Sequence, residues 1–281
     1  MNLIYKVIRK YQQGVMDKLN GRHPDDYKTY RIENVPYMAD GKPEHLLDVY
    51  YPEEPKEALP VILVVHGGAY VSCMKEINSC QSQYFASKGF AVVNMSYTLY
   101  PEADIKVAVD EIYEARKWIE ENAEKYHFDT SKVYLTGDSA GGHLVLLAGS
   151  YKDMEYGFDA IAATCPIGEF SNDKGVTALV LKLVIGGMMK DRDFTLSVDY
   201  RNFMTKDYPP VFLVTTKEDA LLYKHTNAMH KWLETNGIDH KYKEYVGTKN
   251  KLEHVFNVLY PWYEESIEAN NDIIDFFVNV G

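Results

Sequence analysis

Short apolar runs alternate with longer amphipathic segments along the chain from about residue 45 onward. A run of four to eight apolar residues between turn signals is typical of a buried strand, whereas apolar positions spaced three and four apart are typical of a helix. We predict strands at residues 45–52, 60–68, 90–97, 132–137, 160–166, 210–216 and 240–246. Helices are predicted at residues 76–89, 107–126, 140–151, 223–237 and 264–280.

Several of these strands are apolar at almost every position, which is typical of parallel strands that are covered on both faces. Their alternation with helices predicts an α/β fold with a mostly parallel central sheet and helices on both faces. With 281 residues, 46% of them hydrophobic, the chain is long enough to bury one large core. We therefore expect a single domain over residues 1–281.

Two segments, residues 1–30 and 168–208, do not follow the alternation. The second segment separates two predicted strands and contains VTALVLKLVIGG, an apolar helix whose hydrophobicity on several sides favours burial or contact with a ligand. We interpret both segments as elements of a small helical cap. A helical excursion that packs only on the core explains them equally well, and this alternative stays open.

The formal net charge of −11 argues against nucleic acid or an anionic membrane as a partner, because phosphate-binding surfaces need clustered lysine and arginine. The first 15 residues have apolar positions at helical spacing, but basic residues interrupt them, unlike the apolar segment of a signal peptide. No stretch approaches the roughly 20 apolar residues of a membrane span. The three cysteines, Cys73, Cys80 and Cys165, cannot all pair within the chain. We expect free thiols in a cytoplasmic protein.

A glycine-rich turn stands between a predicted strand and a predicted helix in YLTGDSAGGHLVLLAGS, residues 134–150. Its Gly137-Asp138-Ser139-Ala140-Gly141 matches the pattern G-x-S-x-G in the strand-turn-helix context that gives this pattern meaning. Ser139 is the candidate nucleophile, and the helix that follows offers free amides and a positive dipole end to developing negative charge. A glycine-rich connection with Ser139 as the helix N-cap is the alternative interpretation.

A second motif, VILVVHGGAY, places His66, Gly67, Gly68, Ala69 and Tyr70 directly after an apolar strand. Together with GDSAGGH it resembles the α/β-hydrolase serine esterases of the hormone-sensitive-lipase-like group, which read H-G-G-x-[WY]. The resemblance covers about residues 45–260 and implies the α/β-hydrolase fold.

The resemblance also implies an oxyanion hole formed by the main-chain amides of Gly68, Ala69 and Ala140. Ala69 stands where H-G-G-G motifs carry a third glycine, so its methyl and Tyr70 are expected to narrow the site. We assign His66, Gly67, Tyr70 and Asp138 to the substrate-binding region. Within it, His66 is expected to hold the loop in shape, and Asp138 to rigidify the turn through hydrogen bonds.

A serine nucleophile needs a histidine base and a carboxylate, which follow in the order Ser, Asp or Glu, His in this fold. His254 lies on a loop after the last predicted strand and is the candidate base. Asp219 is the candidate acid, because Asp219-Ala220-Leu221 matches the latter half of the family pattern G-x-x-D-x-L; Glu218 is the fallback. His225, His230 and His240 are expected on the surface or in packing, and His143 in a helix-sheet contact.

These residues predict a serine carboxylic-ester hydrolase that acts on short-chain acyl esters through an acyl-enzyme intermediate, with acetylated sugars as a candidate substrate class. The partner is a small-molecule ester, and the oligomeric state is not predicted. We expect no cofactor and no metal, because the sequence has neither metal-ligand spacing nor a phosphate or dinucleotide motif. An amidase or peptidase with the same triad, and a non-catalytic binding protein on this fold, are the alternatives.

Overall fold

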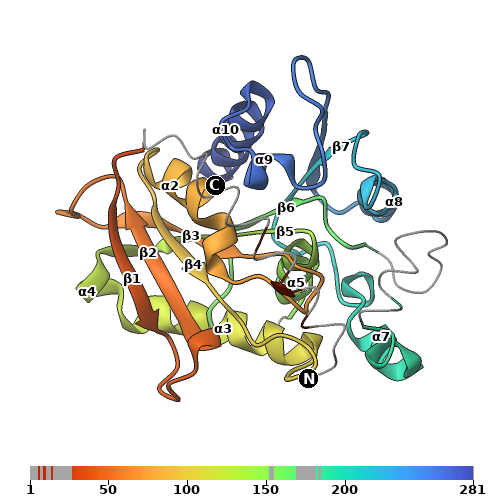
Figure 1. The fold of residues 1–281 in the computed structure, drawn as a ribbon, viewed down its shortest axis with the longest axis horizontal. Helices are drawn as coiled ribbons and strands as arrows, with labels where there is room; N and C mark the ends of the chain where they lie inside the picture. Colours follow the sequence, from red (N-terminus) through yellow and green to blue (C-terminus); the bar gives the residue numbers. More distant parts are fainter. Residues whose placement is uncertain are drawn as a thin grey trace.

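The computed structural model describes residues 27–151, 155–168 and 185–280, together with Lys6, Arg9, Lys10, Gly14 and Lys182. Within these residues the centre is an eight-stranded sheet in the order β1-β2-β4-β3-β5-β6-β7-β8 (Figure 1). Its strands are β1 (Tyr30–Pro36), β2 (Leu46–Tyr51), β3 (Leu59–Val65), β4 (Ala91–Met95), β5 (Phe128–Asp138), β6 (Ala160–Thr164), β7 (Val211–Thr216) and β8 (His240–Tyr245).

Helices connect most of the strands. The α-helices are α2 (Ser79–Ala86), α3 (Ile105–Glu121), α4 (Ala123–Tyr126), α5 (Ala140–Ala148), α7 (Arg192–Ser197), α8 (Tyr223–Asn236), α9 (Phe256–Leu259) and α10 (Glu264–Asn279). Short 3-10 helices are η1 (Pro43–His45), η2 (Lys75–Asn78), η3 (Met188–Lys190) and η4 (Tyr200–Asn202). None of the helices in the described part of the chain is both long and apolar enough to cross a bilayer.

The sheet is parallel from β4 through β8, whereas β1 and β2 pair antiparallel at one edge. The inner parallel strands are buried on both faces, and their side chains alternate between two cores, whereas the edge strand β8 is only partly buried. Along β3, Val61, Leu63 and Val65 join the core under α3 and α5, while Ile62 and Val64 join the core under α2 and α10. In Figure 1, α2 and α10 lie above the sheet, and α3 and α5 lie below it.

The predicted α/β fold with a mostly parallel sheet is confirmed, and the predicted strands and helices are present with shifted ends. The predicted helix at 107–126 begins earlier, because the Asp104 side chain caps α3 by accepting from the amides of Lys106 and Val107. β1 was not predicted: it is a largely exposed edge strand without an apolar face, and its pairing register shifts between Ile32 and Val35.

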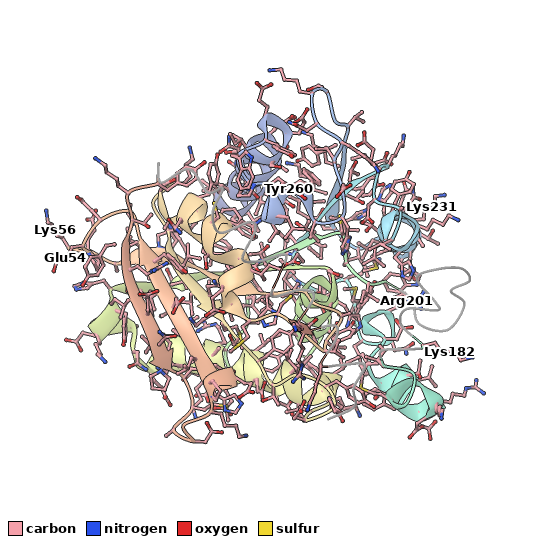
Figure 2. All side chains as sticks on the ribbon, in the orientation of Figure 1. Glu54, Lys56, Lys182, Arg201, Lys231 and Tyr260 are labelled. Atoms are coloured by element: carbon pink, nitrogen blue, oxygen red, sulfur yellow. The ribbon has the colours of Figure 1, made fainter. Side chains whose placement is uncertain are left out.

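Charged side chains such as Glu54, Lys56 and Lys231 project from the periphery of the molecule (Figure 2). The predicted helix at 176–187 and most of residues 1–30 lie outside the described residues. In the rest of the second cap segment, Val198 and Tyr200 are buried and η4 contacts α5. The described end of this segment therefore packs over the helix that follows Ser139.

Candidate active site

Ser139 lies at the sharp turn between β5 and α5. Its backbone has φ 54° and ψ −116°, a combination that non-glycine residues rarely adopt. The Ser139 amide donates to the carbonyl of Thr164 at the end of β6 (2.9 Å), and the amide of Ile167 donates to the Ser139 carbonyl (3.1 Å). The turn therefore presents the Ser139 hydroxyl at the carboxyl edge of the sheet and at the N-terminus of α5.

Both glycines of the turn lie against backbone atoms. A Cβ on Gly141 would lie 2.2 Å from the carbonyl oxygen of Val65 and 2.5 Å from that of His66. A Cβ on Gly137 would lie 2.6 Å from the carbonyl oxygen of Gly141. Because backbone atoms cannot swing aside as a side chain can, this close approach of α5 to β3 requires glycine at both positions.

The three candidate triad residues form one continuous chain of hydrogen bonds. His254 Nε2 lies 2.9 Å from Ser139 Oγ, and His254 Nδ1 lies 2.8 Å from Asp219 Oδ2. In the tautomer that satisfies both contacts, Nδ1–H donates to the carboxylate and Nε2 accepts from the hydroxyl. The Asp219 side chain is fully buried, whereas 22% of the His254 side chain is exposed. The hydrogen-bonded triad is thus buried at Asp219 and partly exposed to solvent at His254.

Asp219 is held as a carboxylate by its neighbours. Burial alone would raise the pKa of Asp219, but the hydrogen bond and charge of His254 and the amides of Leu221 and Leu222 outweigh burial and lower this pKa. These amides donate to Oδ1 at 2.8 and 3.0 Å, which leaves Oδ2 for His254. Asp219 therefore stays ionised at neutral pH with a fixed orientation.

Glu218, the alternative acid, has a different contact. Its Oε2 accepts from the amide of Leu252 at 2.6 Å, which ties the end of β7 to the loop that carries His254. The geometry therefore does not support Glu218 as the partner of His254. The other histidines lie elsewhere: His225 Nδ1 accepts from the amide of Gly168, and His230 and His240 contact each other at 2.9 Å.

The loop after β3 lies directly against the turn that carries Ser139. β3 and β5 pair with Val65 opposite Gly137, so the two loops leave the same edge of the sheet side by side. A Cβ on Gly67 would lie 3.0 Å from Ser139 Cβ. Gly68 and Ala69 have φ of 111° and 53°. Within the described residues no protein group accepts from their amides.

Ala140 completes the set of expected oxyanion donors. It is the first residue of α5, so its amide has no acceptor within the helix. The amides of Gly68 and Ala69 therefore lie in the loop beside the Ser139 turn, and the amide of Ala140 follows Ser139 directly.

The Asp138 side chain connects the turn that carries Ser139 with the loop after β3. Its Oδ1 accepts from the amide of Gly67 (3.2 Å) and from Asn78 Nδ2 (2.9 Å). Burial raises the pKa of Asp138, although Asn78, His254 and the Gly67 amide act in the opposite direction. Asn78, which the sequence analysis did not single out, therefore helps to fix the loop after β3.

The assignment of His66, Tyr70 and Asp138 to substrate binding needs correction, because their side chains are buried inside the protein. The His66 ring stacks on Tyr97 with centroids 4.3 Å apart, and the Tyr70 ring meets His143 edge-on at 5.9 Å. The buried side chains of His66 and Tyr70 thus support the loop from inside the protein. His143, expected in a helix-sheet contact, is fully buried, and its Nε2 lies 2.8 Å from the Val198 carbonyl in the second cap segment.

Cys165 lies beside the acid and the base. Donor atoms of Cys165, Asp219 and His254 all lie within 4.8 Å of one another, and Cys165 is fully buried with φ 45°. Burial, and next the charge of Asp219, raise the pKa of the Cys165 thiol well above its ordinary range, so the residue stays protonated. No spacing in the sequence could reveal this cluster, because its members come from three distant loops.

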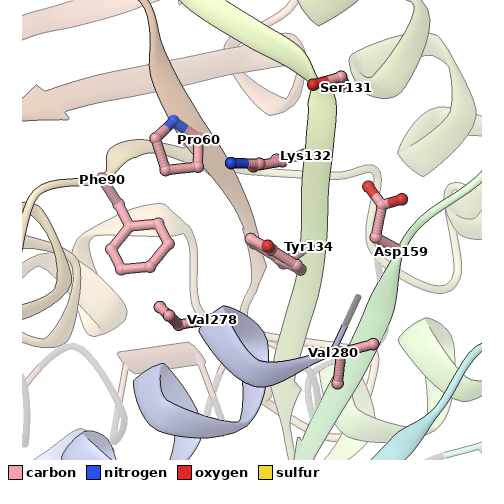
Figure 3. Close-up of a pocket in the computed structure, with 8 residues that line it drawn as sticks. All are labelled: Pro60, Phe90, Ser131, Lys132, Tyr134, Asp159, Val278 and Val280. Carbon is pink, nitrogen blue, oxygen red and sulfur yellow. The ribbon is translucent and has the colours of Figure 1, made fainter.

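Two cavities lined by described residues lie away from Ser139. One, of about 430 Å³, is lined by residues that include Pro60, Phe90, Lys132 and Val278 (Figure 3). Another, of about 390 Å³, adjoins the C-terminal end of α5 at Gly149. Pro60 and Phe90 lie at the starts of β3 and β4, so the first cavity lies at the amino edge of the sheet, opposite the triad.

The sheet order, the strained serine turn and the Ser-His-Asp contacts are together those of the α/β-hydrolase fold. The sequence matches the BD-FAE family over residues 47–233, which is more than half of the chain. The chain belongs to this family.

Individual relatives point to the same class. The chain is 30% identical to the carboxylesterase NlhH of Mycobacterium tuberculosis over 43% of its own length and 38% of the relative. It is 23% identical to the acetyl esterase of Salmonella dublin over 75% and 70% of the two chains. The crystal structure of esterase B from Lactobacillus rhamnosis with an inhibitor superposes with a TM-score of 0.87 at 23% identity, covering 99% and 97% of the chains.

The matched segment spans only 5%, 26% and 38% of the first curated relatives, which are 30–33% identical to it. The predicted resemblance to hormone-sensitive-lipase-like serine esterases and the predicted α/β-hydrolase fold are confirmed.

Proposed function

We propose that this chain hydrolyses short-chain carboxylic esters through an acyl-enzyme formed on Ser139. The unbroken hydrogen-bond chain from Ser139 through His254 to the buried Asp219 carries this proposal. His254 Nε2 takes the hydroxyl proton as Oγ attacks the ester carbonyl, and Asp219 stabilises the imidazolium that forms. The amides of Gly68, Ala69 and Ala140 stabilise the oxyanion. His254 then protonates the departing alcohol, and a water molecule releases the acid by the same route.

The test of this mechanism is Ser139→Ala. We expect hydrolysis of p-nitrophenyl acetate to fall by at least about 10³-fold, because loss of a triad member removes the acyl-enzyme route. Ser131→Ala, on β5 near the opposite edge of the sheet, is the matched control and should keep full activity. A fluorophosphonate should label Ser139, identified by peptide mass spectrometry. Activity of a folded Ser139→Ala protein within tenfold of wild type, or labelling of another serine, would remove Ser139 from the mechanism.

A preference for small acyl groups is proposed from the oxyanion loop. Ala69 places a methyl where a third glycine would leave space, and the buried Tyr70 ring blocks retreat of the loop. An acyl chain that overfills a pocket costs about 1–3 kcal/mol, so kcat/KM on p-nitrophenyl esters should fall sharply beyond about four carbons. Ala69→Gly should raise activity on the hexanoate relative to the acetate. Wild-type activity that still climbs at about eight carbons would contradict the small pocket.

Acetylated sugars are the substrate class that we propose for further screening, in line with the acetyl esterase among the relatives. Rates on p-nitroacetanilide, measured beside the ester, distinguish this proposal from amide hydrolysis.

We also propose that residues 1–30 and 168–208 form the cap. The packing of Val198 and Tyr200 near α5 supports this proposal. A cytoplasmic location is proposed because no disulfide bond joins any two of the three cysteines.

A further inference from the structure

The oxyanion loop, residues 66–73, has a backbone that needs support from outside. Ala69, Tyr70 and Cys73 all have positive φ, between 53° and 69°, and each such residue stores strain. Part of the support comes from residues 97–102, which we call the backing segment. The Tyr97 hydroxyl donates to the His66 carbonyl (3.0 Å), and the Tyr100 amide donates to the Tyr70 carbonyl (2.8 Å).

Arg9 joins the oxyanion loop to the backing segment. Its Nε donates to the Val71 carbonyl at 2.7 Å, and its Nη2 donates to the Tyr100 carbonyl at 3.2 Å and to Glu102 Oε2 at 3.1 Å. These partners lie 62 to 93 residues away along the chain. A guanidinium suits this task because it is permanently charged and presents several donors in one rigid plane.

The contact with Val71 acts on the oxyanion donors through one short step. The Val71 amide donates to the Gly68 carbonyl at 3.1 Å and so closes the turn that contains Gly68 and Ala69. Arg9 therefore restrains Val71, and Val71 in turn restrains the peptide unit between Gly68 and Ala69, which carries the Ala69 amide. Glu102 is about half exposed, so its ion pair with Arg9 contributes little by itself, and the two carbonyl contacts carry the effect.

We propose that Arg9 is a positioning residue for the oxyanion hole, tying the N-terminal segment to the oxyanion loop. The inference rests on the proposed function. Complete loss of one oxyanion donor costs about 10²–10³-fold in kcat, so a loosened loop should cost less, about 3- to 30-fold. KM should stay within about twofold, because the loss acts on the transition state rather than on substrate binding.

The test compares Arg9→Met, which keeps an apolar stem without donors, with Lys10→Met as the neighbouring control and Glu102→Gln, which removes only the ion pair. Arg9→Met should lower kcat on p-nitrophenyl acetate and weaken inhibition by a trifluoromethyl ketone, whose oxyanion occupies the hole, by the same factor. Methylguanidinium should restore part of the kcat of Arg9→Ala. Both controls should match wild type.

A kcat for Arg9→Met within twofold of wild type would overturn the inference. So would a lower melting temperature with unchanged kcat per phosphonate-titrated site, since that result indicates a structural role only. If Arg9→Met does not fold, Arg9→Lys replaces it, because one ammonium cannot hold both carbonyls in the same plane. An unchanged kcat in Arg9→Lys would also overturn the inference. Ser139→Ala measured in parallel separates the two levels: persistent activity in that variant refutes the proposed function, whatever Arg9 does.

Discussion

The two edges of the parallel sheet differ in what their loops contain. Among the described residues, eight non-glycine residues have positive φ, and six of them lie at the carboxyl edge around the triad: Ala69, Tyr70, Cys73, Ser139, Cys165 and Val255. The amino edge has the two cavities, of about 430 and 390 Å³. Positive backbone φ therefore marks the candidate site in this molecule, whereas these two cavities lie at the opposite edge.

The difference has a physical origin. A strained backbone residue costs on the order of 1–3 kcal/mol and persists only where its surroundings fix it. At the carboxyl edge, Ser139 is fixed by the Thr164 carbonyl and by the glycine contacts of α5 with β3. Strain concentrated in this way keeps donors and hydroxyl pre-organised, which is what stabilisation of a transition state requires.

The largest effect should come from breaking the acid contact at the carboxyl edge. Asp219→Asn should lower kcat by about 10²- to 10⁴-fold, because an amide favours the wrong tautomer of His254 and cannot stabilise the imidazolium. Glu218→Gln is the matched neighbour, and its amide oxygen can still accept from Leu252, so activity should fall less than about fivefold. Kinetics on p-nitrophenyl acetate measure both variants. A crippled Glu218→Gln beside an active Asp219→Asn would reverse the assignment of the acid.

A methyl group at each end of α5 sharpens the comparison of the two edges. Gly141→Ala meets the backbone oxygens of Val65 and His66, and should lower the free energy of unfolding by about 3 kcal/mol or more. Gly149→Ala, beside the cavity at the amino edge, meets the side chains of Ile161 and Tyr208 instead of backbone atoms. Side chains can shift further than backbone and the φ of −59° suits alanine, so the loss of stability should be smaller than for Gly141→Ala.

Urea unfolding followed by circular dichroism measures this pair. Equal losses of stability at the two positions would mean that the carboxyl edge is no tighter than the amino edge.

The last prediction concerns the pH dependence of stability. Burial lowers the pKa of both His66 and His143 to about 4, against opposing hydrogen bonds to backbone carbonyls. The unfolded chain therefore takes up these protons first, and the free energy of unfolding should fall as pH drops from about 6.5 to 4. Each histidine contributes up to about 1.4 kcal/mol per pH unit in that window. His143→Gln should flatten the slope by about one proton in urea unfolding at several pH values. An unchanged slope would show that His143 does not stay neutral when buried.

Motifs with local meaning were predictable from the sequence. The apolar runs predicted the parallel strands, because burial on both faces leaves an almost continuous hydrophobic signature. Ser139 and Gly67 were found because a tight turn and a close backbone approach need glycine at fixed spacing. His254 and Asp219 could be placed because each follows the end of a late strand, and the structure brings them together.

Contacts between distant loops were not predictable. Asn78, Cys165 and Arg9 occur in unremarkable surroundings, and only the packed fold brings them to Asp138, to Asp219 and to the Val71 carbonyl. Substrate contact was expected for Tyr70 because a motif shows which residues adjoin the serine but not which way their side chains turn. The bulged edge strand β1 also escaped prediction, since its mostly exposed side chains follow neither helical nor alternating periodicity.

The contact between Gly67 and Asp138 has a consequence for how such sequences can diverge. A Cβ on Gly67 would lie 2.5 Å from Asp138 Oδ2, while the Gly67 amide donates to the same carboxylate. A larger residue at 67 therefore needs a smaller one at 138, and a smaller residue at 138 removes an anchor of the loop. Neither position can change alone. Residues 67 and 138, which are 71 positions apart in the chain, should therefore change together or not at all.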